Sequence, residues 1–473
     1  MELNKTFIDG LWSKEINVSD FVSKNITSYT GDASFLQGPT ERTKHIWNLC
    51  LKALEEERAN NGVRSLDHTT VSTITSHKAG YIDKENELIV GLQTDELLRR
   101  AIKPFGGINV VAKACRENGV EVDDKVKDIF THYRKTHNDG VFDVYTEEIR
   151  SFRSLGFLTG LPDNYARGRI IGDYRRLALY GIDRLIEAKQ EDLRHLTGPM
   201  TEARIRLREE VAEQIKALKD IKTMGEYYGL DLSHPATSAQ EAVQWVYMAY
   251  LAAVKEQDGA AMSLGNVSSF LDIFIEYDLA HGKIDETFAQ ELIDQFIIKL
   301  RMVRHLRMQS YNDIFAGDPT WVTEAIGGRF NDGRVKVTKT SFRFLQTLYN
   351  LGPSPEPNMT VLWSPELPEG FKEFCAKVSV DTSSIQYEND NLMREVRNCD
   401  DYGIACCVSY QAIGKQIQFF GARANLAKAL LLAINGGRCE NTGTVMVKGI
   451  PVLTHDTLNF EEVMNNYKKV LTE

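Results

Sequence analysis

Hydrophobic residues recur at helical spacing through the first two thirds of the chain. In 40–60, Ile46, Leu49, Leu51 and Leu54 indicate one buried helix face. In 201–224, hydrophobic positions three or four residues apart alternate with Arg and Glu, which is typical of an amphipathic helix. The same spacing predicts helices over 236–256 and 287–308. We therefore expect a helical layer up to about residue 140 and a predominantly helical middle.

After Gly327 the pattern changes to short runs of β-branched and aromatic residues. The runs 335–338, 359–363 and 384–387 are separated by Pro, Gly and Asn clusters and predict strands. Helical patterns follow over 421–437, which two glycines end, and over 460–471. Strands that alternate with helices predict an α/β fold.

Length and composition narrow the class of protein. A chain of 473 residues is too long for one simple core, so we expect two domains or one large α/β body. Its 42% hydrophobic and 26% charged residues are ordinary for a soluble globular protein, and no apolar run approaches the roughly 20 residues of a membrane span. The net charge of −10 argues against nucleic acid as a partner.

The N-terminus lacks a secretory pattern and the seven cysteines show no disulfide-framework spacing, so a reducing cytoplasm is the expected compartment. Two of these cysteines are adjacent, Cys406 and Cys407, in a stretch that favours a strand or tight hairpin. Roughly 0.09 adjacent pairs are expected by chance. From the residues alone, two buried thiols or a strained redox disulfide remain open, with burial first. No further cysteines or histidines have metal-site spacing, so we expect no metal.

Arginines beside glycines are further candidates. A guanidinium holds a carboxylate through two parallel hydrogen bonds, so Arg169 and Arg423 suit a small anionic substrate. The alternatives are an ion pair with Asp173 for Arg169 and a surface charge at a helix start for Arg423. The run 327–333 is interpreted as a hairpin turn.

Several segments together identify a family resemblance. The segments are 73–77, 133–145, 156–176, 354–359, 404–409 and 419–428. They resemble the pyruvate formate-lyase family of glycyl radical enzymes, the formate acetyltransferases, and the resemblance predicts one such domain over 1–473. It implies part of a ten-stranded α/β barrel, made of two five-stranded parallel halves, with a helical N-terminal layer and the cysteines on a central finger loop.

The resemblance also implies a reaction. Pyruvate and coenzyme A give formate and acetyl-CoA through an acetyl-enzyme. In the family the first cysteine, here Cys406, attacks pyruvate as a thiyl radical and holds the acetyl group, while Cys407 relays hydrogen atoms. A dry pocket protects such intermediates.

Matching by residue assigns the remaining site. Arg169 and Arg423 are expected to hold the substrate carboxylate. Ala260, Phe315 and Trp321 are expected to shape a pocket for a three-carbon acid. His77 and Phe142 align with positions near coenzyme A, where adenine can stack on an aromatic ring.

One departure concerns the radical. The family stores it on a glycine in an Arg-Val-Ser-Gly-Tyr-like motif, which this sequence lacks. We expect the N-terminal part of such an enzyme, as a homodimer or in complex with a separate glycyl-radical polypeptide, activated by a radical S-adenosylmethionine enzyme. The alternatives are a non-catalytic truncated paralogue that acts as an interaction subunit, a 2-oxobutyrate formate-lyase and a dithiol redox protein.

Overall fold

The computed structural model describes residues 6–102, 107–134, 142–160, 169–257, 261–310, 320–407, 409–418, 422–454 and 458–473. The chain forms two compact units. Unit 1 comprises Met1–Pro104, Ile108–Tyr133 and Arg169–Ile417, and unit 2 comprises Phe105–Gly107, Arg134–Gly168 and Gln418–Glu473. The prediction of one family domain over 1–473 stays a prediction.

In the N-terminal part of unit 1 the described helices outnumber the strands, as predicted, but residues 72–98 contain neither a helix nor a strand. This part contains the 3-10 helix η2 (Leu11–Ser13), α1 (Val18–Asn25), α2 (Glu41–Ala59), the parallel strands β1 (Ser65–Val71) and β2 (Arg99–Ile102), α3 (Ile108–Glu117), α4 (Asp124–Asp128) and the π-helix η3 (Ile129–Tyr133).

Helix α2 confirms the helix predicted over 40–60. The Thr40 side chain accepts the Thr43 N–H and starts the helix. The buried stripe runs through Ile46, Cys50 and Ala53. Leu51 lies off this stripe and is 40% exposed, so its predicted burial is wrong.

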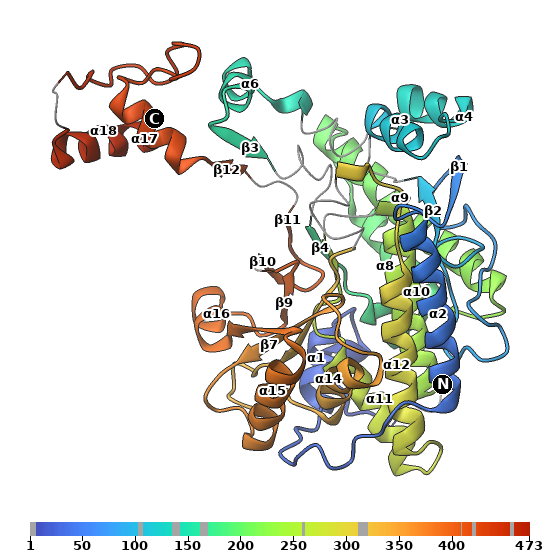
Figure 1. Ribbon diagram of the computed structural model, residues 1–473. Coiled ribbons are helices and arrows are strands. Elements are labelled where there is room, and N and C mark those ends of the chain that lie inside the picture. The colour runs from blue at the N-terminus through green and yellow to red at the C-terminus, as the bar shows by residue number, and fades with distance from the viewer. Residues whose placement is uncertain are drawn as a thin grey trace. The chain divides into compact units, whose positions relative to one another are not determined.

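Five helices form the bulk of unit 1: α8 (Arg175–His195), α9 (Glu202–Tyr227), α10 (Ala239–Gln257), α11 (Ser268–Ala280) and α12 (Glu286–Met302). Helices α2, α10 and α12 lie side by side (Figure 1). Three of the helices confirm the patterns at 201–224, 236–256 and 287–308, but α12 ends before residue 308. Val303 is extended, and the Leu306 N–H donates to the Ala101 oxygen at 2.8 Å, because this segment runs beside β2.

A parallel array of strands supports the finger loop. It consists of β4 (Arg169–Ile171), β5 (Ala261–Ser263), β6 (Thr323–Gly327), β7 (Asn358–Trp363) and β8 (Ile385–Asn389). Neighbours pair in parallel from β4 to β5 and from β6 through β7 to β8. The two sheets are joined by a parallel bridge between Gly265 and Glu324 and by the Leu264 N–H, which donates to the Thr323 oxygen at 2.8 Å. Five parallel strands thus follow one another in the described residues.

Helices α14 (Lys339–Asn350), α15 (Glu369–Thr382) and α16 (Asp390–Arg397) alternate with these strands, which confirms the α/β prediction. The strands predicted over 359–363 and 384–387 are β7 and β8. The strand predicted over 335–338 is wrong. Val335 makes only an isolated antiparallel bridge with Arg329, across the predicted turn, and Thr338 is already the N-cap of α14.

The hairpin of β9 (Tyr402–Ala405) and β10 (Ser409–Ala412) is the predicted finger loop. Ser409 pairs with Ala405, and β9 contacts β4, β5 and β6. One face of the hairpin buries Tyr402 and Ile404 against Ala325 and Leu362, and the other buries Ala405 against Ile171. The hairpin is therefore packed on both faces. Strand β11 (Ile417–Gln418) follows it.

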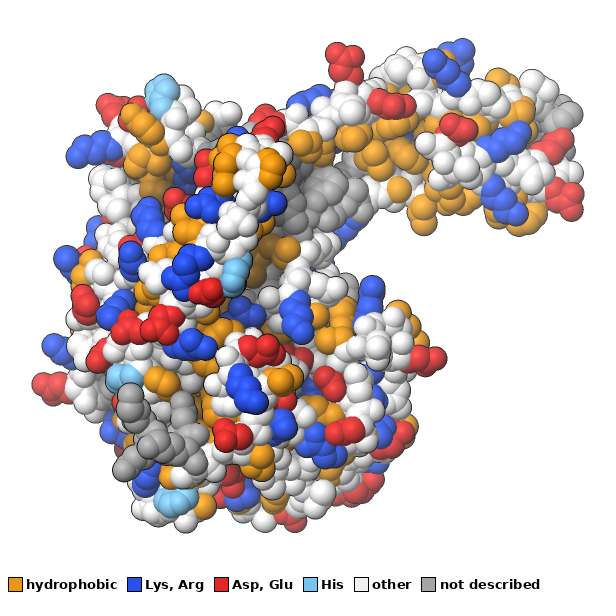
Figure 2. Space-filling model, turned by 180° about the vertical axis from the view of Figure 1, so that it is seen from behind, with side chains coloured by type: hydrophobic (Ala, Val, Ile, Leu, Met, Phe, Trp, Pro, Cys, Tyr) orange, Lys and Arg blue, Asp and Glu red, His pale blue; other side chains and the backbone are white. Residues whose placement is uncertain are grey.

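Unit 2 contains α6 (Glu147–Ser154), the antiparallel strands β3 (Leu158–Gly160) and β12 (Ala422–Ala424), α17 (Leu426–Ile434) and α18 (Phe460–Thr472). The last two confirm the predicted helices, although α17 starts late because Asn425 is its N-cap. Figure 2 shows hydrophobic side chains exposed over the part of the molecule that holds these helices. In these two helices Leu430 is 42% exposed and Phe460 is 75% exposed.

Among the described helices, none combines the length and the apolar character that crossing a membrane requires.

Candidate active site

Cys406 and Cys407 lie in the turn between β9 and β10. Cys406 is 8% exposed, Cys407 is half-buried, and both are free thiols. The φ angle of Cys406 is 63°, in the left-handed region that residues other than glycine rarely adopt. The predicted burial thus holds for Cys406, and the structure contains no disulfide between the two.

Four side chains from neighbouring strands bind the main chain of the two cysteines. The Ser263 hydroxyl of β5 accepts the Cys406 N–H at 3.2 Å. The Thr323 hydroxyl of β6 and the Asn358 amide of β7 both donate to the Cys406 carbonyl, the latter at 3.2 Å. The Gln386 amide of β8 donates to the Cys407 carbonyl at 2.6 Å. The sheet therefore holds the turn through side chains.

The Cys406 thiol is kept protonated at neutral pH. Burial raises its pKa to about 12, the adjacent Cys407 adds to the rise, and the nearby Arg169 guanidinium opposes it. A thiol with so high a pKa is a poor source of thiolate but keeps its S–H bond for hydrogen-atom chemistry.

Arg169 lies at the start of β4, buried and close to this turn. Its guanidinium donates to the hydroxyl of Ser409, the first residue of β10. The ion pairs of Asp173 are with Arg175 at 2.7 Å and Arg176 at 3.5 Å. The structure therefore places Arg169 close to the cysteine turn, and its role as a ligand of the substrate carboxylate stays a prediction.

A cavity of about 720 Å³ in unit 1 opens onto both cysteines. Trp321, Thr323, Asn358 and Gln386 line it, together with residues of α2 and of the segment 353–356. Trp321 has a φ of 55°, and its carbonyl accepts the Ser263 hydroxyl at 3.4 Å. The structure thus brings Trp321 to the cavity that opens onto the cysteines, and its role in shaping a substrate pocket stays a prediction.

Three further residues are predicted to shape the pocket or to hold the substrate. Ala260 and Phe315 lie outside the described residues. Arg423 is an exposed residue of β12 in unit 2 and pairs in register with Thr159. Its role as a second carboxylate ligand stays a prediction.

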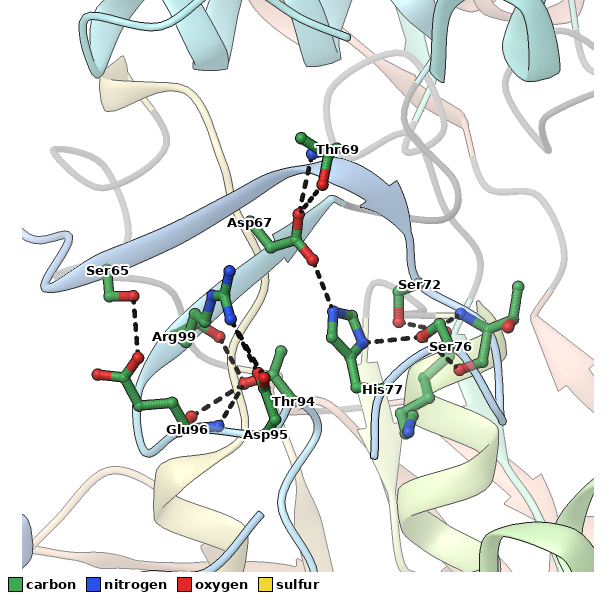
Figure 3. A network of polar contacts seen from close by, with 12 residues as sticks. Ser65, Asp67, Thr69, Ser72, Ser76, His77, Thr94, Asp95, Glu96 and Arg99 are labelled. Carbon is green, nitrogen blue, oxygen red and sulfur yellow. Dashed lines mark hydrogen bonds and ion pairs between the residues drawn. The ribbon is translucent and has the colours of Figure 1, made fainter. Parts of the chain in front are cut away.

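His77 belongs to a separate polar network beside β1 (Figure 3). Its Nε2 lies 3.0 Å from an Asp67 carboxylate oxygen, and its Nδ1 lies 2.8 Å from the Ser76 hydroxyl. Burial lowers the pKa of His77, and the hydrogen bond with Asp67 opposes this shift. The side chain is 5% exposed, so adenine stacking on the ring would require a rearrangement.

Phe142, the other residue predicted near coenzyme A, belongs to unit 2 and is half-buried. Its ring meets Tyr145 edge-on at 5.5 Å, and the Arg153 guanidinium lies 5.0 Å from its centroid. The role of Phe142 near coenzyme A stays a prediction.

Sequence reasoning missed Ser263, Thr323, Asn358 and Gln386. Asn358 lies in the segment 354–359 that contributed to the family resemblance, but the other three leave no signal, because a polar residue at a strand end is ordinary. Within the ranges that the structure describes, no group of three or more His, Cys, Asp and Glu side chains is arranged to hold a metal ion.

Comparisons with known proteins give the family. The model of the pyruvate formate lyase-like family matches residues 11–473. A formate acetyltransferase of Haemophilus influenzae is 57% identical over 465 residues, which cover 97% of this chain and 60% of that protein. This chain thus spans less than two thirds of the length of that relative.

Solved structures share the fold. The B12-independent glycerol dehydratase from Clostridium butyricum superposes with a TM-score of 0.73 at 20% identity, covering 93% of this chain and 63% of that one. A glycyl radical enzyme from Archaeoglobus fulgidus gives 0.65 at 17% identity, covering 92% and 61%. The fold is therefore that of the glycyl radical enzymes, and the chain belongs to the pyruvate formate lyase-like family.

Proposed function

We propose that this chain provides the thiol-bearing part of a formate C-acetyltransferase, which converts pyruvate and coenzyme A to acetyl-CoA and formate. The observation that supports this most directly is the placement of the two thiols. They lie on a turn held by the parallel sheet, with Arg169 beside them, in a chain 57% identical to a formate acetyltransferase.

The protonated Cys406 thiol favours a radical route over thiolate attack. When present, a glycyl radical supplies a hydrogen-atom acceptor for the thiols. The resulting Cys406 sulfur radical adds to C2 of pyruvate, and the C1–C2 bond then breaks homolytically. The carboxyl carbon leaves as the radical anion of carbon dioxide, and the acetyl group stays on Cys406 as a thioester.

Cys407 completes the exchange. Its S–H hydrogen atom passes to the carbon dioxide radical anion, which gives formate and leaves the radical on Cys407. The coenzyme A thiol then takes the acetyl group, and its proton returns to the Cys406 sulfur. Adjacency of the two thiols keeps these transfers within the closed site.

Arg169 is proposed to bind the pyruvate carboxylate, with Arg423 as a second ligand and Ala260, Phe315 and Trp321 shaping the pocket. A buried guanidinium can bind a carboxylate bidentately. Arg169→Lys keeps the charge but loses the fork, so it should raise the KM for pyruvate about tenfold.

The proposed partners follow from the reaction. The glycine that stores the radical comes from a segment outside this sequence, activated by a radical S-adenosylmethionine enzyme. His77 and Phe142 are proposed near coenzyme A, and the cytoplasm is the proposed location. The preference for pyruvate over 2-oxobutyrate is tested by comparing kcat/KM for the two acids, which differ by one methylene.

The test is anaerobic exchange of labelled formate into pyruvate, with the activating enzyme and a polypeptide that carries the glycine. Exchange should occur and should disappear in Cys406→Ser and in Cys407→Ser. Cys399→Ser, a half-buried free thiol just before β9, is the matched control and should retain activity. Exchange that persists in Cys406→Ser would refute the proposal, and a folded, radical-bearing complex without exchange would support a non-catalytic subunit.

A further inference from the structure

The four side chains at the cysteine turn form a row across the parallel array. Ser263 is the last residue of β5, Thr323 and Asn358 are the first residues of β6 and β7, and Gln386 is the second residue of β8. Thr323 and Asn358 are register partners, and the Thr323 carbonyl accepts the N–H of Leu264, the residue after Ser263. One polar side chain from each of four neighbouring strands therefore points to the same turn.

Their targets are three consecutive peptide groups. Ser263 holds the N–H between Ala405 and Cys406. Thr323 and Asn358 hold the carbonyl between Cys406 and Cys407, and Gln386 holds the carbonyl that follows Cys407. A peptide group can rotate between its neighbours with little change in the course of the chain, but the rotation turns its carbonyl away from such donors.

The backbone at this turn needs such restraint. Cys406 adopts a left-handed φ of 63°, a conformation that persists in residues with a Cβ only where the surroundings enforce it. Rotation of the peptide between the cysteines would also change the direction of one side chain relative to the other, since it changes ψ of Cys406 and φ of Cys407.

We propose that Ser263, Thr323, Asn358 and Gln386 are positioning residues that lock the peptide planes around Cys406 and Cys407 and so set the directions of the two thiols. The proposal rests on the proposed function for the roles of those thiols. Hydrogen-atom transfer depends steeply on alignment, and a misplacement of about 1 Å can cost on the order of a hundredfold in rate.

Paired variants separate positioning from stability. Thr323→Val removes the hydroxyl at constant shape, whereas Thr323→Ser keeps it. Gln386→Glu replaces the donor by an acceptor that faces the Cys407 carbonyl. Gln346→Glu is its control, because Gln346 on α14 is also half-buried and hydrogen-bonded, to Asn350 at 3.0 Å.

The first readout uses the chain alone. Anaerobic alkylation by iodoacetamide, resolved by peptide mass spectrometry, gives separate rates for Cys406 and Cys407. Cys407 should react faster in the unaltered chain. Thr323→Val and Gln386→Glu should change the ratio of the two rates about tenfold, as for the loss of one hydrogen bond, while Thr323→Ser and Gln346→Glu stay within about twofold.

The second readout is formate exchange in the complex. Thr323→Val and Gln386→Glu should lower kcat about tenfold or more and leave the KM for pyruvate within about twofold, with recovery in Thr323→Ser. Equal alkylation ratios in Thr323→Val and Thr323→Ser, together with an unchanged ratio in Gln386→Glu, would overturn the positioning role even if exchange is seen. A shifted ratio without exchange in the unaltered complex would support positioning and refute the proposed function.

Discussion

The cysteine turn of unit 1 and the helices α17 and α18 of unit 2 differ in how far the rest of the chain covers them. The turn is held by four strands, and its hairpin is packed on both faces. In unit 2 a small core around Leu432 and Val470 stands beside a largely uncovered apolar surface, with Phe460 75% exposed. The position of the thiols is thus set within unit 1, whereas unit 2, which contains Arg423, leaves apolar surface of the kind that partners cover.

The largest expected effect comes from the base of the hairpin. Arg175, 1% exposed, pairs with Asp173 at 2.7 Å and with Asp401 at 2.9 Å, which joins α8 to the residue before β9. Arg175→Met removes the buried cation that two carboxylates share, and it should lower the free energy of unfolding of unit 1 by about 3–5 kcal/mol. Urea denaturation measures the change.

The neighbouring Arg176 supplies the control. It is 36% exposed at its side chain and lies 3.5 Å from Asp173. Arg176→Met should cost at most about 1 kcal/mol. Equal losses in the two variants would show that the hairpin base does not depend on the buried pair.

An intermediate effect is expected from pH, and it should act on unit 1. Burial lowers the pKa of His77, so near its usual titration the unfolded chain binds more protons than the folded one. The free energy of unfolding should therefore fall as pH drops through about 6.5. Burial raises the pKa of Asp67, but hydrogen bonds from Thr69 and His77 outweigh this effect and lower the pKa to about 2. The stability that the Asp67 carboxylate contributes is therefore lost only below about pH 4.

Hydrogen exchange at two pH values, corrected for intrinsic rates, tests this. Protection of β1 should fall from about pH 7.5 to about pH 5.5, while protection of α17 and α18 changes little. His77→Gln should remove the dependence and His132→Gln, an exposed control, should keep it. The same pH response in His77→Gln would assign it to other groups.

The smallest effect on folding is expected at the exposed surface of unit 2. Leu430→Lys and Phe460→Lys replace exposed apolar side chains, so the free energy of unfolding should change by no more than about 0.5 kcal/mol. Self-association, measured by sedimentation velocity, should fall because the apolar surface is reduced. A large loss of stability would mean that this surface is packed within the chain. The contrast between the covered cysteine turn and the uncovered helices α17 and α18 would then be wrong.

The sequence predicted the helices well because their signals are local. Thr40 and Asn425 accept N–H groups three residues onward and mark the starts of α2 and α17. It failed at 335–338, where the β-type composition competes with the capping box of Thr338. It also predicted the end of α12 six residues too late, because the pairing of the segment after Met302 with β2 is a tertiary contact.

In the candidate site, too, the sequence identified residues but not the long-range contacts that they make. Cys406, Cys407, Arg169 and Trp321 were named from the sequence. In the structure Trp321 and both cysteines line one cavity, and Arg169 lies near the Cys406 thiol. His77 was also named, but its hydrogen bonds with Asp67 and Ser76 were not.

The sequence by itself determined the family, the alternation of helices and strands, and the hairpin with its adjacent thiols, because these depend on neighbouring residues or on dense local motifs. Only the tertiary structure decided that Ser263, Thr323, Asn358 and Gln386 converge on that hairpin and that its surroundings raise the pKa of Cys406. Residues up to 143 positions apart meet there through main-chain N–H and carbonyl groups, and such groups, which nearly every residue has, leave no mark in the sequence.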